Sequence, residues 1–155
     1  SSAASDVYKR QGPGKYDAFV STVTDDCKIN IEVDGKPSSF NFRVRTIPEA
    51  QAFIGGQPSG ANINAGSFRA QGGVGAGIKN FPFELEYDVL SFTFTCDTDD
   101  DIVSIPNQGA AFSSQVRAAI NQYVQAGRMV TIDDIRVKGP DGRTNKAPSL
   151  VYYIK

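Results

Sequence analysis

Histidine is missing from this chain of 155 residues. It is the commonest general base and a frequent zinc ligand, so its absence excludes Ser-His-Asp and Cys-His catalysis and every zinc site that needs imidazole. No other group of side chains pairs a nucleophile with a base. We therefore expect a protein that is not an enzyme and has no catalytic residues and no cofactor.

Cysteine is scarce as well, with only Cys27 and Cys96 in the chain. Two thiols cannot make a four-ligand metal site, and these two do not have CxxC spacing. Each lies in the apolar phase of its own strand-like run, Cys27 with Ile29 and Cys96 with Phe94. We expect both thiols to be reduced, unpaired and buried in different β units.

The chain also lacks a charge excess and a long apolar run. Its 16 basic and 17 acidic side chains leave a formal net charge of -1, so no overall field attracts nucleic acid or an anionic membrane. No apolar run reaches the roughly 18 residues that span a bilayer. We expect a soluble fragment that does not bind nucleic acid.

The N-terminal third is predicted to form β-strands after a short stretch without a strand or helix pattern. Residues 1–13 have neither an apolar signal core nor strand alternation through most of their length, and we interpret them as a leader or cloning remnant. Alternation at 27–33 and 39–45, separated by a turn-rich stretch at 34–38, predicts an antiparallel hairpin. With a further strand near 16–23, residues 14–46 are predicted to be part of an immunoglobulin-like domain.

A change of composition follows. Residues 47–64 are rich in glycine, proline, serine and asparagine and are predicted to be a linker. The glycine run at 72–77 lacks GxGxxG spacing and a following Lys-Ser/Thr, so we interpret it as a strand or strand edge that allows close backbone approach.

Residues 65–155 are predicted to form a C-terminal β-sandwich-like domain with one helix. The apolar residues of 81–96 change phase once, which predicts a strand with a bulge or bend near Val89 and Leu90. The only helical periodicity lies at 113–126, with Ser113 as N-cap, and strands are predicted at 129–138 and 150–155. The fold class is therefore mainly β, with immunoglobulin-like β-sandwich units, the C-terminal one carrying a single α-helix.

An acidic run, 97–101, has two readings. Its alternating carboxylates suit calcium, but Ile102 and Gln108 stand where an EF-hand loop needs glycine and glutamate. The other reading, which we favour, is a solvated hairpin tip.

Several stretches together resemble the C-terminal region of the gliding-motility protein family GldM, called PorM in non-gliding relatives. They are FRVRTIPEAQAFIGG, NFPFELEYDVLSFTFT, GRMVTIDDIRVKGPDGR and the terminal LVYYIK, and their order matches as well. The resemblance covers about residues 14–155. It implies a component of the type IX secretion and gliding machinery of Bacteroidota.

The resemblance also implies a place in that machine. The family's full-length protein is membrane-anchored and forms a dimeric periplasmic shaft of consecutive immunoglobulin-like domains. This chain would be the distal periplasmic part of the shaft, a structural and interaction module. Its partners would be a second copy of itself and the ring components associated with the outer membrane.

One loop is our candidate partner interface. It displays an acid between two bases on a turn, and its residues are Lys138, Gly139, Pro140, Asp141, Gly142 and Arg143. The simpler interpretation is a tight turn without a partner. A preorganised loop loses little entropy on binding, however, and arginine can bind a carboxylate through two hydrogen bonds.

The alternative function is a carbohydrate- or surface-binding β-sandwich module, since this architecture serves many functions. It would need exposed aromatic side chains, which Tyr152 and Tyr153 can supply. Adjacent strand residues face opposite sides, so we expect one of the two in the core.

Overall fold

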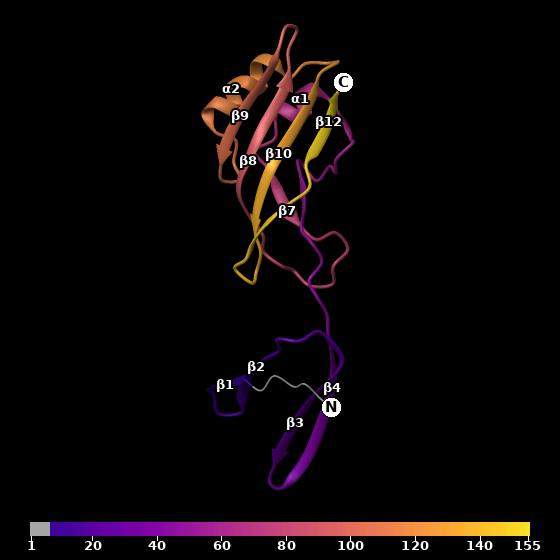
Figure 1. Ribbon diagram of the computed structural model, residues 1–155, viewed down its shortest axis with the longest axis vertical. Coiled ribbons are helices and arrows are strands. Elements are labelled where there is room, and N and C mark those ends of the chain that lie inside the picture. Colours follow the sequence, from indigo (N-terminus) through magenta and orange to yellow (C-terminus); the bar gives the residue numbers. More distant parts are fainter. Residues whose placement is uncertain (1–6) are drawn as a thin grey trace. The chain divides into compact units, whose positions relative to one another are not determined.

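The computed structural model describes the backbone of residues 7–155 and the side chains of residues 13–155. The chain divides into two compact units, Ser1–Pro48 and Glu49–Lys155 (Figure 1). Of the stretch interpreted as a leader or cloning remnant, residues 1–6 lie outside the described residues. Val7–Gly12 forms strand β1, which pairs antiparallel with β2, Lys15–Phe19.

The N-terminal unit contains the predicted hairpin. β3, Thr24–Val33, pairs antiparallel with β4, Lys36–Val44, which confirms the pairing. The connecting turn is shorter than the five residues expected, because Asp34 and Gly35 both have positive φ, 52° and 71°. Two such residues make the tight turn whose twist matches that of paired strands.

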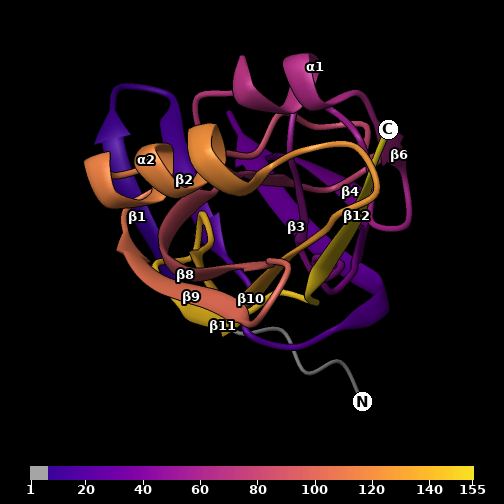
Figure 2. The same ribbon diagram turned by 90° about the horizontal axis from the view of Figure 1, so that it is seen from above.

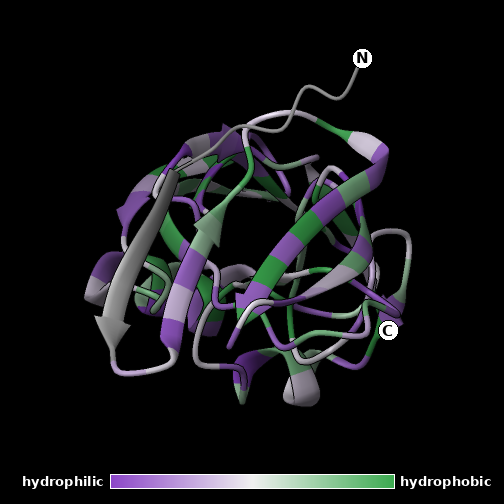
Figure 3. Cartoon of the chain, turned by 90° about the horizontal axis from the view of Figure 1, so that it is seen from below, coloured by the Kyte–Doolittle hydropathy of each residue, from purple (hydrophilic) through white to green (hydrophobic). Residues whose placement is uncertain are grey.

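One face of this hairpin is apolar and open to solvent. Figure 3 shows apolar and polar bands alternating along its strands, as a period of two residues requires. We call this surface the hairpin face; its residues are the half-buried Ile29 and the exposed Ile31, Val33, Phe40 and Phe42.

The C-terminal unit is built on a six-stranded sheet with the order β6-β12-β10-β8-β9, in which β11 also pairs with β10. β6 and β12 are parallel, and the other pairs are antiparallel. The strands are β6 (Asn62–Ile63), β8 (Asp88–Asp97), β9 (Ile102–Gln108), β10 (Met129–Lys138), β11 (Thr144–Lys146) and β12 (Leu150–Ile154).

A second layer covers one face of this sheet. It consists of the small β5–β7 sheet, Gln51–Phe53 and Gly75–Gly77, and the helices α1, Ala65–Arg69, and α2, Ser114–Tyr123. Figure 2 shows both helices along the same side of the curved sheet. The described chain is thus mainly β, has several sheets and is consistent with a β-sandwich, as predicted.

Helix α2 is close to its predicted position. The Ser113 hydroxyl accepts the Val116 N–H at 3.3 Å, which confirms the N-cap. Val116, Ala119 and Ile120 are buried against the sheet layer. The helix ends at Tyr123, three residues before the expected end, and α1 is a second helix of five residues that the sequence did not predict.

The stretch predicted to be a linker, 47–64, contains β5 and β6. Ala52, Ile54 and Ile63 from this stretch are buried in the core of the C-terminal unit. Isolated apolar residues between glycines and prolines carry too little periodicity to predict such short strands.

The predicted bulge is confirmed at Leu90, while the strand itself is shorter than predicted. Ser91 pairs with Arg136 and Val89 with Val137, so Leu90 is the extra residue on β8. β8 begins only at Asp88, not at residue 81, because its partner β10 ends at Lys138, opposite Asp88. Residues 81–87 are therefore left without a paired strand.

Candidate functional site

The candidate loop, 138–143, joins β10 to β11 and is closed by its own backbone. Gly139 donates its N–H to the Arg143 carbonyl at 2.9 Å, and Gly142 donates to the Gly139 carbonyl at 3.0 Å. The Asp141 carboxylate accepts the Arg143 N–H at 3.0 Å. Gly142 has φ 77°, a value that favours glycine. The loop is preorganised, as the sequence predicts for a turn.

Its charged side chains are available to a partner. Lys138, Asp141 and Arg143 are all exposed, and the Arg143 side chain is 83% exposed. Arg143 lies 3.7 Å from the Asp141 carboxylate, an ion pair that contributes little at such exposure. The guanidinium can therefore exchange this contact for another carboxylate at small cost.

The base of the loop lies beside Tyr87, in the segment that precedes β8. A methyl group at Gly139 would lie 3.5 Å from the Tyr87 ring. Partial burial, and then the Asp141 carboxylate, raise the pKa of the Tyr87 hydroxyl. Gly139 thus lies against Tyr87, while the charged residues of the loop remain exposed.

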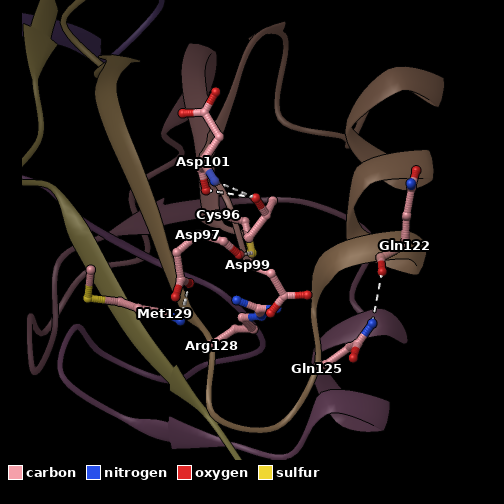
Figure 4. Close-up of polar contacts among 9 residues, drawn as sticks. Cys96, Asp97, Asp99, Asp101, Gln122, Gln125, Arg128 and Met129 are labelled. Carbon is pink, nitrogen blue, oxygen red and sulfur yellow. Dashed lines mark hydrogen bonds and ion pairs between the residues drawn. The ribbon is translucent and has the colours of Figure 1, made fainter.

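The acidic run forms the tip of the β8–β9 hairpin, and three of its carboxylates have a donor of their own. Figure 4 shows Asp97 beside Met129 and Asp99 beside Arg128. Asp97 accepts the Met129 N–H at 2.6 Å, Asp101 accepts the Ile102 N–H at 2.7 Å, and Asp99 pairs with Arg128. Within residues 13–155, no group of acidic, cysteine or histidine side chains is arranged to hold a metal ion. The run therefore lies at a hairpin tip, the interpretation that we favoured.

Both cysteines are free and buried, in different units. Burial and the neighbouring Asp97 raise the pKa of the Cys96 thiol to about 11, against a smaller opposite effect of Arg128. A thiol that stays protonated at neutral pH is a poor nucleophile. The arrangement suits a packing role for Cys96.

The two adjacent tyrosines separate as predicted. Tyr152 is fully buried, and its hydroxyl donates to the Gln57 carbonyl at 2.8 Å. Tyr153 is 49% exposed. Tyr153 is thus the one of the pair that is left for the surface.

The sequence did not reveal a groove that the structure forms between the β5–β7 sheet and residues 78–86. Its aromatic walls include Phe53, Phe81 and Phe83. Apolar and acidic residues alternate at 83–88, and this pattern predicted a paired strand rather than the wall of a groove. In Figure 1 the segment after β7 and the β10–β11 loop lie toward the same end of the C-terminal unit.

Comparison with known proteins gives one family. The family model described as the GldM C-terminal domain matches residues 28–155, most of the chain. No curated protein matches the sequence. None of the described helices is long and apolar enough to cross a membrane.

The matched region contains the β3–β4 hairpin from Lys28 onward and the entire C-terminal unit with the 138–143 loop. The family is a component of gliding motility and type IX secretion. The chain belongs to the GldM C-terminal domain family.

Proposed function

We propose that this chain is the distal periplasmic part of a type IX secretion and gliding shaft, where it acts as a structural and interaction module. Its task is to contact a ring associated with the outer membrane. The observation that carries the proposal is a family match over residues 28–155 combined with a preorganised, charged and exposed loop at 138–143.

The loop suits a carboxylate-bearing partner surface. Arg143 offers a planar guanidinium for two parallel hydrogen bonds, and Lys138 adds a second positive charge. The backbone bonds across the loop hold both ends in place, so little conformational entropy is lost on binding.

The hairpin face supports the second part of the proposal, a homodimer. Ile31, Val33, Phe40 and Phe42 are each at least 45% exposed on a two-stranded sheet. Such a sheet is marginal alone, and a second copy would cover both its apolar face and its open edges.

Site-specific photocrosslinking tests the ring contact. The photoreactive amino acid p-benzoylphenylalanine would replace Pro140 in the loop, or Gln122 on the exposed side of α2 as the matched control. We expect crosslinks to a ring component from position 140 only. Equal crosslinking from both positions, or none from position 140 with the ring present, would contradict the assignment of the loop.

A further inference from the structure

The groove beside the β5–β7 sheet has the size and lining of a peptide-binding surface. It is an open groove with a volume of about 750 Å³, and it lies wholly within the C-terminal unit. Phe83 on its wall is 69% exposed and Phe53 is 36% exposed. The rings of Phe81 and Phe83 pack edge to face with centroids 5.7 Å apart. Large apolar side chains that gather at a groove mark an interaction site.

The backbone along this groove has no partner. In the part of the chain that the structure describes, residues 81–86 form no backbone hydrogen bond with another element. β10, which would have to continue opposite them, turns away after Lys138. Pro82 has no N–H, so the row of unpaired N–H and C=O groups begins at Phe83. Such a row is the feature to which an additional strand binds.

The side chains of the same segment alternate in chemistry. Phe83 and Leu85 are apolar, Glu84 and Glu86 are acidic, and all four line the groove. Within residues 13–155, neither glutamate forms an ion pair. Lys79 is the one basic side chain among the groove residues. Two free carboxylates against one ammonium favour a basic occupant and disfavour an acidic one or a nucleic acid.

We propose that this groove binds an extended protein segment in which apolar side chains alternate with lysine or arginine. The segment adds as a strand to residues 83–86, so that its apolar residues lie beside Phe83 and Leu85 and its basic residues beside Glu84 and Glu86. Opposite residues of adjacent strands are the pairs that stabilise a sheet. This surface is separate from the 138–143 loop, and the inference does not depend on the loop's partner.

Peptide binding to the unmodified chain tests the proposal first. The probe is a fluorescein-labelled synthetic peptide that alternates valine and arginine, followed by fluorescence anisotropy at physiological ionic strength. We expect binding to fall about tenfold or more when glutamate replaces arginine. Two further peptides are N-methylated, one at its valines and one at its arginines. Successive amides of a strand point to opposite edges, so a similar fall is expected for the one peptide whose methylated amides face residues 83–86 and can no longer donate. Undiminished binding of both N-methylated peptides would overturn strand addition.

Variants then locate the site. Glu84→Gln/Glu86→Gln should weaken binding of the arginine peptide about tenfold, as expected for the loss of two facing charges. The matched control, Glu32→Gln/Asp100→Asn, removes two exposed carboxylates elsewhere and should bind like the unmodified chain. Equal effects of the two double variants would overturn the assignment to the groove. The proposal of a basic peptide would also be overturned if a neutral tetrasaccharide displaced the bound peptide and binding did not depend on the charge of the peptide.

Discussion

The hydroxyl of Tyr152 accepts the backbone N–H of Ile54 at 3.0 Å, across 98 positions of sequence. The same hydroxyl donates to the Gln57 carbonyl. One buried side chain thus fastens the irregular stretch after β5 to the last strand of the main sheet.

Tyr152→Phe is expected to lower the free energy of unfolding by about 1–3 kcal/mol, because it leaves the buried Ile54 N–H without its partner. Denaturant titration followed by circular dichroism measures the change. Tyr153→Phe is the matched control, since Tyr153 is half exposed, and it should be nearly neutral. Equal stability of the two variants would contradict the role given to the Tyr152 hydroxyl.

Gly73→Ala is expected to destabilise the chain by about 1–3 kcal/mol through overpacking. A Cβ at this position would lie 2.1 Å from the Ala110 carbonyl oxygen, where Gly73 forms a β-bridge with Ala111. Gly72→Ala is the control, because a Cβ there meets nothing within 4 Å. If both variants melt at the same temperature, the close approach of the two backbones is not a constraint.

Stability is expected to fall between pH 9 and pH 11 in part because of Cys96. Its thiol has a pKa of about 11 in the folded chain, above its ordinary value of 9.0. The unfolded chain loses this proton first, so rising pH favours unfolding until the folded thiol also ionises. Melting temperatures over this range should decline less steeply in Cys96→Ala. Parallel pH profiles for both proteins would show that Cys96 does not contribute.

The chain is expected to be a dimer at tens of micromolar, and Phe40→Thr/Phe42→Thr should shift it toward the monomer by removing apolar area from the hairpin face. Sedimentation velocity measures the mass. The matched control, Ser39→Thr/Asn41→Thr, introduces the same two threonines on the opposite face of β4. This variant should remain dimeric. A monomer in the unmodified chain would contradict the proposed homodimer.

Much of the fold follows from periodicity in the sequence. The phase change around Leu90 predicted a bulge because Val89 and Phe92 must both face the core, and both are buried. Ile132 and Ile135 on β10 are three residues apart, as Val89 and Phe92 are on β8. A second register shift lies between Asp133 and Arg136, where Asp134 has φ 48°. The same spacing thus marks a bulge on β10 as well.

Other features leave no local pattern. β5 has three residues, and only its tertiary contacts distinguish it from a loop. Residues 83–87 alternate like a strand, yet the strand that would pair with them ends at Lys138. The 138–143 loop was predictable because turn chemistry is local, whereas the groove needs segments that are distant in sequence.

The central claim, that the 138–143 loop contacts the ring, is tested most directly by the affinity of the chain for purified ring components. Lys138→Ala/Arg143→Ala should weaken binding about tenfold or more with little change in melting temperature, as expected for exposed charges at an interface. Arg117→Ala/Lys155→Ala removes the same two charge types from other exposed positions and should bind normally. Unchanged affinity of a folded Lys138→Ala/Arg143→Ala variant would contradict the claim.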